Sequence, residues 1–536
     1  MGSSGERDVL IVGGGHNGLV AAFYLARAGL RPTVLERRAI VGGACVTEEF
    51  APGFRASPGA YVLSMLRPAI WHDMRLVARG LRLEPSGPSL TVFPDGSRFS
   101  LSDDDGDSRA AIERLSKKDA AVYPRFQARL ARMAQAVLPL SDTSPPDPGL
   151  RSAGDVRGFT ELGRLAWRHR KLLPEIAFLF ATSVTTYLNE SFESEELKSA
   201  LGWESISNTL AGPSTPGTAY GLLHEAASGS AGGGLGWGFV RGGMGRVTEL
   251  MAEAAAEHGA IIRTDAEVEG IMTASGRVVG VRLTTGEELR APTVLSNADP
   301  KRTFLGLVDD GLPDEFTASV RAYRCEGASM KINLALSSLP FVPGLPSDGP
   351  QPYHRGLIQI TKPLPDLDAD QAQARRGEPA EAGHIELCFP SVLDPSLAPE
   401  GQYVATLGVR SQPHSLAGTT WDELREPAAD RVIEHLGRFM PDLPGAVLHR
   451  QVLTPLDLER KLYLTGGHHM HGDMSPDQML FLRPVRGYAA YRTPIRGLYL
   501  CGAGTHPGGG VTGANGRNAA REVIHDLKRR RRPWAN

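Results

Sequence analysis

The segment Gly13-Gly14-Gly15-His16-Asn17-Gly18 restricts the fold of this chain more than any other feature of its sequence. It follows a short apolar run, Asp8 to Val12, and opens a segment, Asn17 to Ala28, with apolar residues at helical spacing. In a G-x-G-x-x-G loop between a strand and a helix, the glycines let the backbone turn tightly, approach a pyrophosphate and pack against the strand. The alternative is a glycine turn in another kind of α/β protein. Glu36 directly follows the next apolar run, Pro32 to Leu35. In dinucleotide-binding proteins, a carboxylate at this position accepts a hydrogen bond from a ribose hydroxyl. The glycine loop and Glu36 together therefore predict a dinucleotide site.

Two further glycine-rich segments point to the same kind of ligand. Val41-Gly42-Gly43-Ala44 lies just after Glu36, where a second stretch of backbone can reach the same pyrophosphate. Near the other end of the chain, the loop from Gly502 to Gly516 follows an apolar strand, Gly497 to Cys501, and precedes a helix that we expect to run to about Lys528. The N-terminus of such a helix stabilises negative charge, as on the pyrimidine ring of a reduced flavin. The alternative is a loop that merely needs unusual backbone angles.

The two glycine-loop units lie at opposite ends of the chain, so a domain that uses both must be assembled from separate segments. We predict a cofactor domain from residues 1–95, 235–310 and 485–536. Residues 96–234 and 311–484 then form a substrate domain, mostly helical in its first part and rich in strands in its second. Inside the middle cofactor segment we expect a helix over 245–258, a strand over 260–263, a meander over 268–290 and a buried strand over 293–296.

Composition and charge exclude several classes of protein. The 536 residues carry a formal net charge of −2, which argues against a general nucleic-acid binder. The four cysteines form no C-x-x-C pair, so dithiol redox chemistry and a zinc ribbon are disfavoured, and a reducing, cytoplasmic location is the simplest interpretation. The sequence has no run of roughly 18 apolar residues, so it predicts no membrane-spanning helix. Arg241 to Gly245 opens a helix but does not fit G-x-G-x-x-G, so we predict one dinucleotide site and no separate NAD(P)H domain.

Several longer stretches make the chain similar to a known family. They are GGGHNGLVAA, ERRAIVGGACVTEEFAPGF, YVLSMLRP, RGGMG, VLSNADP, KINLAL, LTPLDLER, MSPDQM and GLYLCGAGTHPGGGVTGANGRNAA. Through these stretches, spread from residue 8 to about residue 526, the chain resembles the phytoene-desaturase-type FAD oxidoreductases and, within them, the pyridine nucleotide-disulfide oxidoreductase domain-containing protein 2 group. The resemblance implies an α/β fold, with a Rossmann-like FAD-binding domain of the glutathione-reductase/amine-oxidase type and an interleaved α+β substrate domain.

The resemblance also implies FAD in an extended form, with its ADP half on the N-terminal unit and its flavin near the C-terminal loop. The ADP half would contact the N-terminal glycines, Glu36 and Arg37, and the backbone of Val268 would meet the adenine. The flavin ring would lie against His506 to Val511 and Gly513. The predicted cofactor-binding residues are Gly13, Gly15, His16, Asn17, Gly18, Glu36, Arg37, Gly42, Gly43, Ala44, Val268, Gly502, Gly504, His506, Gly508, Gly509, Gly510, Val511 and Gly513.

The chain departs from its relatives in two respects. Many related flavoproteins carry an acid just after the C-terminal strand, where this chain has Gly502-Ala503-Gly504. The name of the similar group mentions disulfide chemistry, which this chain has no C-x-x-C pair to perform. The family has no agreed catalytic base to carry over to this chain.

Three residues are candidates for a catalytic role. His506 lies in the flavin-facing loop, where it either moves a proton or shapes the loop through hydrogen bonds to backbone. Glu225 and Arg241 flank the glycine-dense segment over 228–245 and are candidates for touching a substrate. The cluster from His468 to Asp473 lacks a familiar ligand spacing, so we expect a loop near the substrate mouth and no metal site.

A basic segment followed by an apolar one occupies Arg164 to Tyr187. Such a segment can lie on a membrane surface, and the alternative is a core helix of the substrate domain. Peripheral membrane contact and a homo-oligomer therefore both stay open. The basic tail from Lys528 to Arg532 fits a solvated helix end.

We predict that this FAD-dependent oxidoreductase removes a hydride from a carbon of a mostly apolar substrate and leaves a double bond. Oxygen or a quinone would be the acceptor, because the sequence has no second nucleotide signature. Three alternatives stay open: a redox-neutral flavin-dependent isomerase, an amine oxidase-like enzyme, and a flavin-bearing protein whose main role is partner binding.

Overall fold

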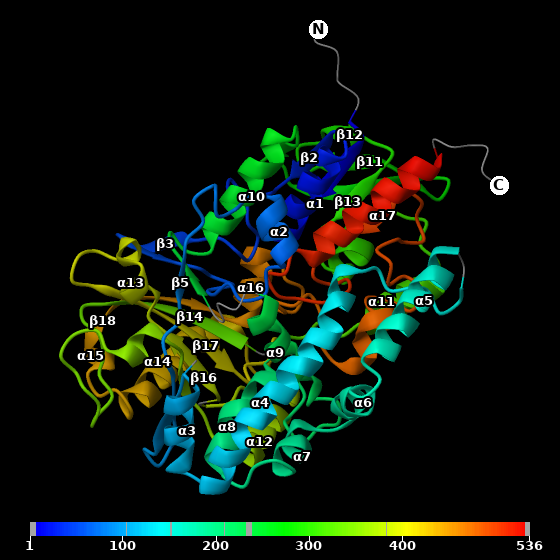
Figure 1. The fold of residues 1–536 in the computed structure, drawn as a ribbon. Coiled ribbons are helices and arrows are strands. Elements are labelled where there is room, and N and C mark those ends of the chain that lie inside the picture. Colours follow the sequence, from blue (N-terminus) through cyan, green and yellow to red (C-terminus); the bar gives the residue numbers. More distant parts are fainter. Residues whose placement is uncertain are drawn as a thin grey trace.

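The computed structural model describes residues 7–102, 104–150, 153–207, 209–231, 238–327, 329–381 and 383–530. Two sheets organise these residues, one with five parallel strands and one with seven mostly antiparallel strands. Figure 1 shows the five-stranded sheet beside both ends of the chain, and the seven-stranded sheet at the opposite end of the molecule. Part of the glycine-dense segment over 228–245, and the end of the basic tail, lie outside the described residues.

The five-stranded sheet is built from segments far apart in the sequence. All its neighbouring strands run parallel. Val9 and Ile11 pack against helices on one face, while Leu10 and Val12 pack against the meander on the other, so both faces of this strand are buried. Burial on both faces explains a run of apolar residues without alternation. The strands, in spatial order, are β19 (Leu498–Leu500), β13 (Val294–Ser296), β1 (Val9–Val12), β2 (Pro32–Leu35) and β9 (Ile261–Arg263).

Helices and a small sheet cover the two faces of the parallel sheet. The helices are α1 (His16–Arg27), α10 (Gly245–Glu257) and α17 (Ala514–Arg530), and the meander consists of β10 (Val268–Ala274), β11 (Arg277–Leu283) and β12 (Glu288–Arg290). The predicted strands and helices of this region are present, with shifts of a few residues; the last helix begins at Ala514 instead of after Gly516. The Rossmann-like fold class predicted from the sequence is thus confirmed.

The seven-stranded sheet presents two different faces. Met330, Ile332 and Leu334 point into a core closed by the helix α14 (Trp421–Gly437), so the intervening Lys331 faces the other side. All neighbouring pairs are antiparallel except β15 with β6. The strands, in spatial order, are β18 (Val447–Leu453), β14 (Ser329–Leu336), β17 (Tyr403–Arg410), β16 (Ile385–Cys388), β15 (Ile358–Ile360), β6 (Ser89–Val92) and β7 (Arg98–Leu101).

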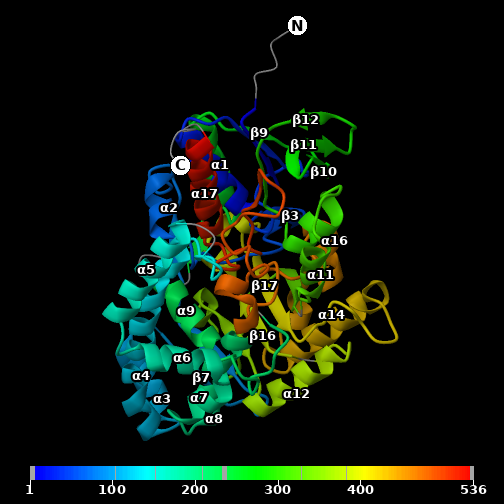
Figure 2. The same ribbon diagram turned by 90° about the vertical axis from the view of Figure 1, so that its right-hand side faces the viewer.

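A layer of helices packs beside this sheet around its own apolar core (Figure 2). The first part of the predicted substrate domain, residues 96–234, was predicted to be mostly helical; it begins with strand β7, and helices follow. The longest helix, α4, starts after Ser116, whose hydroxyl accepts a hydrogen bond from the backbone N–H of Asp119. The helices are α3 (Asp105–Glu113), α4 (Lys117–Val137), α5 (Ala153–Arg168), α6 (Leu173–Ala181), α7 (Val184–Asn189), α8 (Glu195–Gly202) and α9 (Tyr220–Ala231).

The remaining elements connect these layers. They are β3 (Glu48–Ala51), β4 (Phe54–Ala56), α2 (Pro68–Asp73), β5 (Leu83–Pro85), β8 (Gly238–Val240), α11 (Asp314–Ala322), α12 (Leu364–Arg375), α13 (Pro390–Leu393), α15 (Leu443–Ala446) and α16 (Pro455–Leu462). The division of the chain into two domains stays a prediction, and β6 and β7, on either side of the boundary predicted at residue 95, both belong to the seven-stranded sheet. None of the helices in the described part of the chain is long and apolar enough to cross a membrane.

Candidate cofactor and active site

The loop between β1 and α1 is fastened to the end of β2 by a carboxylate. Glu36 Oε2 accepts a hydrogen bond of 2.8 Å from the backbone N–H of Gly14, and Glu36 Oε1 accepts one of 3.0 Å from the N–H of Arg38. Gly13 has φ +94°, which a residue with a side chain rarely adopts. The geometry fits the prediction that this loop and Glu36 hold the pyrophosphate and ribose of a dinucleotide.

The second glycine turn packs directly on the first. The N–H of Gly42 donates to the carbonyl of Gly14 at 2.9 Å. A Cβ added to Gly43 would lie 3.2 Å from the Cα of Gly15, and Gly43 has φ +59°. Only residues without side chains bring these two backbones so close.

The C-terminal loop is held in shape by a buried asparagine. Asn515 Nδ2 donates to the carbonyls of Thr505, His506 and Gly508 at 3.0, 3.1 and 3.2 Å. A Cβ added to Gly510 would lie 2.4 Å from the sulfur of Met65, so this loop also needs glycine for close packing. The sequence analysis missed Asn515, although it stands within the predicted loop over 502–516 that it organises.

A cavity of about 350 Å³ runs along these loops, and we call it the main cavity. Asn297, which we had not predicted, also lines it, beside Gly13 and Gly15. The predicted cofactor residues that line it are Gly13, Gly15, His16, Asn17, Glu36, Arg37, Gly42, Gly43, Ala44, Val268, Gly510 and Val511.

A second cavity of about 330 Å³ lies on the other side of the C-terminal loop. Gly509 and Thr512 line the second cavity, whereas Gly510 and Val511 line the main one, and Met65 lines both. The predicted residues His506 and Gly509 thus lie on the second cavity. Five predicted glycines line neither cavity, and a Cβ at any of them would crowd a neighbouring atom: Gly18, Gly502, Gly504, Gly508 and Gly513.

Five buried side-chain atoms that line the main cavity have no hydrogen-bond partner among the described residues. They are His16 Nε2, Arg38 Nη1, Lys331 Nζ, Arg410 Nε and His471 Nδ1. Buried polar atoms without partners are costly, so a ligand with many oxygen and nitrogen atoms would remove an unfavourable state. Together with the glycine cradle, these atoms make the cavity fit FAD.

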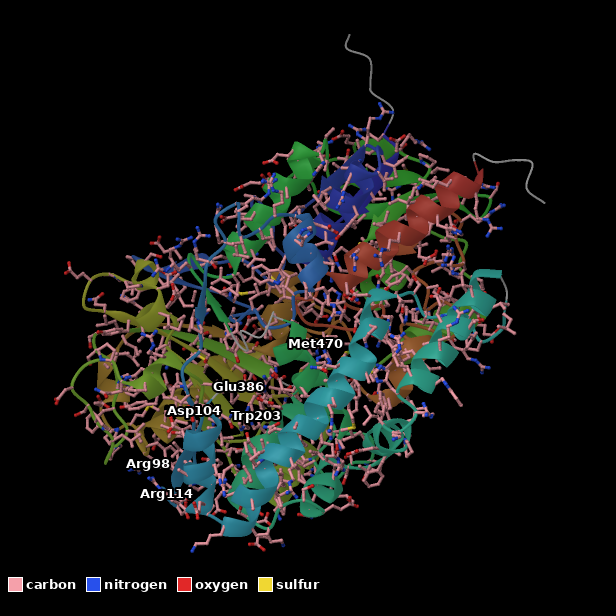
Figure 3. All side chains as sticks on the ribbon, in the orientation of Figure 1. Arg98, Asp104, Arg114, Trp203, Glu386 and Met470 are labelled. Carbon is pink, nitrogen blue, oxygen red and sulfur yellow. The ribbon has the colours of Figure 1, made fainter. Side chains whose placement is uncertain are left out.

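One end of the main cavity carries a compact group of ionisable side chains. The guanidinium of Arg410 donates to both oxygens of Glu386 at 2.8 and 2.9 Å, and the hydroxyl of Tyr61 donates to Glu386 Oε2 at 2.8 Å. Burial and the Glu386 carboxylate hold the pKa of Tyr61 well above its usual value. Glu386, labelled in Figure 3, is buried, with 2% of its surface exposed. The sequence analysis did not single out any of these three residues.

Lys331 lies on the same side of the sheet as this group. Its ammonium nitrogen is 3.9 Å from the centre of the Tyr61 ring and has no hydrogen-bond partner among the described residues. Burial lowers the pKa of Lys331 to about 7. An amine that changes its charge near neutral pH inside a cavity is suited to proton transfer. The sequence carries a signal for this, since Lys331 and Asn333 alternate with Met330, Ile332 and Leu334 along β14 and therefore lie on its other face.

At the other end of the main cavity, two arginines enclose a tyrosine. The guanidinium carbons of Arg37 and Arg302 lie 3.7 and 3.4 Å from the centre of the Tyr463 ring. The two arginines belong to segments that are far apart in the sequence. The hydroxyl of Tyr463 donates to Glu267 Oε1 at 2.6 Å. Glu267 precedes Val268, the residue predicted to meet the adenine, so this cluster borders the adenine end of the predicted ligand.

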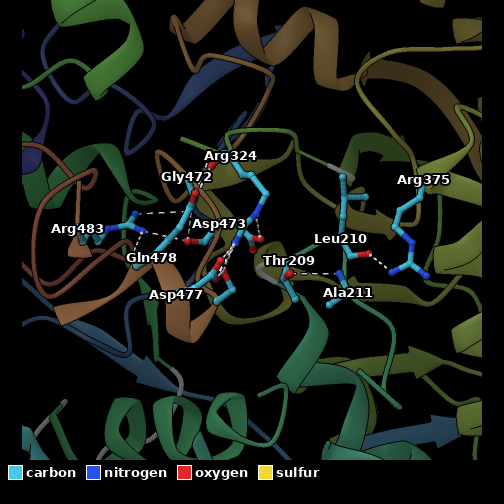
Figure 4. A network of polar contacts seen from close by, with 11 residues as sticks. Thr209, Leu210, Ala211, Arg324, Arg375, Gly472, Asp473, Asp477, Gln478 and Arg483 are labelled. Carbon is cyan, nitrogen blue, oxygen red and sulfur yellow. Dashed lines mark hydrogen bonds and ion pairs between the residues drawn. The ribbon is translucent and has the colours of Figure 1, made fainter. Parts of the chain in front are cut away.

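The loop from His468 to Arg483 is fixed by a polar network (Figure 4). Arg324 donates to Asp473 Oδ2 at 3.3 Å and to Asp477 Oδ1 at 2.7 Å, and the fully buried Arg483 donates to the carbonyl of Asp473 at 3.0 Å. Asp473 is therefore engaged in holding the loop. His469 and His471 of this loop line the main cavity, and burial lowers the pKa of each.

The three candidate catalytic residues lie in different places. The Nε2–H of His506 donates to the carbonyl of Leu140 at 2.9 Å, and burial lowers the pKa of His506 to about 4, so the ring is neutral at pH 7. Arg241 is 60% exposed and pairs with Glu84 at 2.7 Å. Glu225 belongs to α9 and is not in the lining of either cavity. Lys331 is thus better placed than any of them to act beside a ligand in the main cavity.

The model of one protein family, described as flavin containing amine oxidoreductase, matches residues 18–524. The chain belongs to this family. It is an FAD-dependent oxidoreductase, and the FAD predicted from the sequence is its cofactor. FAD bound in the main cavity would be held by the glycine loops and Glu36 at the ADP half.

Curated relatives match over nearly the whole chain. Pyridine nucleotide-disulfide oxidoreductase domain-containing protein 2 of Rattus norvegicus is 40% identical, with 98% of this chain and 94% of the relative covered. One subunit of the limonene dehydrogenase of Castellaniella defragrans is 28% identical, with 97% and 95% covered. Phytoene desaturase (neurosporene-forming) of Cereibacter sphaeroides is 26% identical, with 95% and 92% covered. The resemblance noted from the sequence is confirmed.

A solved structure, an oxidoreductase from Methanosarcina mazei, has a TM-score of 0.62 to this chain. It is 17% identical, and the match covers 97% of this chain and all of the other. The likeness extends over both sheets and supports the fold.

Proposed function

We propose that this FAD-dependent oxidoreductase is a dehydrogenase or desaturase, which removes a hydride from a carbon of a mostly apolar substrate. Oxygen or a quinone would reoxidise the cofactor, since the sequence carries one dinucleotide signature. The observation that carries the proposal is the second cavity, which is separated from the main cavity by the C-terminal loop and Met65.

The second cavity is suited to an apolar ligand. Its walls are mainly aliphatic and aromatic side chains of α5, α6, α9 and the end of α4. Burial lowers the pKa of His224 and of His506, both in its lining, to about 4, so these rings are uncharged at neutral pH. Arg67, also in the lining, is paired with Asp142 at 2.6 Å. A ligand with few polar groups would leave no buried charge without a partner.

The charges at the polar end of the main cavity disfavour an amine substrate. Lys331 and Arg410 are both cationic when protonated, and the nearby carboxylate of Glu386 is already bound by Arg410 and Tyr61. An ammonium group entering there would meet like charge and find no free acid. The amine oxidase-like alternative is therefore the weaker one, although the family carries amine oxidoreductase in its description.

The protein would contribute orientation, exclusion of water and the handling of one proton. FAD, when bound, supplies the hydride acceptor. Forming a carbon–carbon double bond also requires that the neighbouring carbon loses a proton. Lys331 lines the main cavity, so its neutral amine can accept this proton only from a part of the substrate that extends past Met65 into that cavity. Names of two relatives, limonene dehydrogenase and phytoene desaturase, refer to apolar hydrocarbons and are consistent with this chemistry.

The test is an anaerobic visible spectrum of the flavin-loaded protein before and after addition of a lipid-soluble extract of its host. Bleaching of the flavin bands, followed by their return when oxygen or a quinone is added, is the expected result. Ala166→Phe would place a large side chain in the second cavity and should slow the bleaching, whereas Ala110→Phe on the exposed face of α3 should not.

The alternatives predict other outcomes. A redox-neutral isomerase would convert a lipid without net bleaching and without an acceptor. An amine oxidase-like enzyme would be bleached by amines and release peroxide. A protein that only binds partners would show neither bleaching nor conversion, and that result would overturn the proposal.

A further inference from the structure

The main cavity and the second cavity meet at one side chain. The described residues that line the two cavities form two separate sets, and Met65 is the one described residue that belongs to both. The C-terminal loop runs between the cavities, with Gly510 and Val511 lining the main one and Gly509 and Thr512 lining the second. The boundary between the cavities therefore consists of this loop and the side chain of Met65.

The proposed reaction requires contact across this boundary. Reacting atoms must approach to about 3–3.5 Å before a hydride can be transferred. The glycine loops that would hold FAD line the main cavity, whereas the walls suited to an apolar ligand belong to the second cavity. A substrate bound in the second cavity must therefore extend past Met65 before it can react.

The backbone on both sides of Met65 is fixed. The N–H of Leu63 donates to the carbonyl of Gly238 at 2.9 Å, and the N–H of Arg67 donates to the carbonyl of Thr512 at 3.1 Å. Leu63 is also buried in the apolar core around α1 and α10. Moving this backbone would break these contacts, so the side chain of Met65 is the part of the boundary that can move at low cost.

The Met65 side chain lies on the middle of the loop that divides the cavities. A Cβ added to Gly510 would overlap the sulfur of Met65, so the thioether rests directly on this glycine. Ser64 lines the main cavity and Arg67 lines the second, so the chain itself crosses the boundary at Met65. Methionine is unbranched and has three rotatable side-chain bonds, so it changes conformation more readily than a branched side chain.

We infer that the side chain of Met65 is a gate between the two cavities and determines which apolar ligands reach the flavin. With the thioether on Gly510 the boundary is closed. Rotation of the side chain joins the two cavities, and one end of a ligand in the second cavity can then enter the main one. The inference rests on the proposed function in taking the second cavity as the substrate site, but the gate itself can be measured without turnover.

The experiment uses N-phenyl-1-naphthylamine, an uncharged aromatic probe, and the flavin-loaded protein in its oxidised state. The fluorescence of this probe rises in apolar surroundings and therefore reports the occupancy of the second cavity. Its electron-rich rings give a long-wavelength charge-transfer band when they contact an oxidised flavin. The intensity of that band per bound probe measures how often the probe passes Met65.

Two substitutions of Met65 should change the band in opposite directions. Met65→Ala removes the thioether and should raise the band per bound probe at least about threefold, because the boundary then stays open. Met65→Ile puts a stiff β-branched side chain of similar size at the boundary and should lower the band at least about threefold, with probe fluorescence retained. Both variants should keep the flavin absorbance of the parent.

The matched control is Met479→Ala. Met479 is buried and lines the second cavity but not the main one, so the substitution enlarges the second cavity and leaves the boundary intact. Its band per bound probe should equal that of the parent. Equal bands in the parent, Met65→Ala and Met65→Ile would overturn the inference, as would an increase in Met479→Ala as large as that in Met65→Ala.

Flavin bleaching separates the gate from the proposed activity. Met65→Ile should slow anaerobic bleaching by the lipid-soluble extract. If the band responds to Met65 as expected but no extract bleaches the flavin, the gate is supported and the dehydrogenase proposal fails. If the probe gives no fluorescence increase with the parent or any variant, the second cavity takes no apolar ligand, and both proposals are overturned.

Discussion

Replacing Lys331 by Met should make the protein more stable at neutral pH. Burial lowers the pKa of Lys331 from its ordinary value of 10.5 to about 7. A tenfold change in proton affinity is about 1.4 kcal/mol, so holding this amine inside the protein costs about 5 kcal/mol well below pH 7. Methionine has a similar length and no charge, and it removes this cost.

The effect should depend on pH with a defined sign. Between pH 7 and 10.5 the unfolded chain binds a proton at Lys331 and the folded chain does not, so the stability of the parent rises with pH. Below pH 7 both states bind the proton and the cost stays constant. The advantage of Lys331→Met should therefore fall from about 4.5 kcal/mol at pH 6.5 to about 1.5 kcal/mol at pH 9.5.

The assay is thermal unfolding of the flavin-free protein followed by circular dichroism, because bound FAD would offer the amine of Lys331 polar partners. For a chain of 536 residues, 1 kcal/mol corresponds to roughly 1 °C in Tm if the chain unfolds as one unit. We expect the Tm of Lys331→Met to exceed that of the parent by about 4 °C at pH 6.5 and by less than about 2 °C at pH 9.5.

The matched control is Lys198→Met on α8. The side chain of Lys198 is 7% exposed, but its amine donates to Asn189 Oδ1 at 2.8 Å and pairs with Glu195. Glu195 is 57% exposed, so replacing Lys198 breaks a partly exposed pair and relieves no unpartnered charge, and this variant should melt no higher than the parent at neutral pH. If Lys331→Met also melts lower at pH 6.5, or if its advantage does not shrink with pH, Lys331 is not an unpartnered buried amine and our reasoning about it fails.

Three further predictions concern the cofactor. Glu36→Gln removes the negative charge of the carboxylate that accepts a hydrogen bond from the Gly14 N–H. The change should weaken FAD binding about tenfold to a hundredfold, measured by titrating the apoprotein with FAD. Gly15→Ala would place a Cβ 2.8 Å from Asn297 Nδ2 and should lower the ratio of flavin to protein absorbance after purification, whereas unchanged occupancy would show that Asn297 moves aside. Tyr463→Ala removes a ring contacted by two guanidinium groups and should speed flavin release about tenfold, while Tyr463→Phe keeps the ring and should release flavin at nearly the parent rate.

The nucleotide end of the site was predictable because its parts are close in sequence. The strand β1, the glycine loop, α1, β2 and Glu36 follow one another within the first 36 residues, and each position has a local requirement. Gly13 needs a positive φ, and Glu36 stands at the end of its strand. These backbone and side-chain requirements are met by residues that are neighbours in the sequence. They therefore produce a sequence motif that can be recognised without knowing the rest of the fold.

The catalytic end was not predictable in the same way. His506 attracted attention because it lies in a glycine loop, yet its Nε2–H bonds to Leu140 and its ring is neutral. Lys331 was passed over, since a lysine in a strand is usually exposed. Its properties depend on Tyr61 and Glu386, which approach it from distant parts of the chain.

The sequence alone predicted a strand–glycine loop–helix unit with a dinucleotide site, because that unit depends on short-range backbone geometry in a fixed order, and its resemblance to a known family implied the Rossmann-like fold class and the FAD cofactor. Only the tertiary structure brought Tyr61, Lys331 and Glu386 to one cavity and put a second cavity behind α5 and α6. The lowered pKa of Lys331 arises from the removal of water by surrounding segments, and the shape of a cavity arises from what those segments leave unfilled. Both are properties of packing between distant residues, which local sequence patterns do not contain.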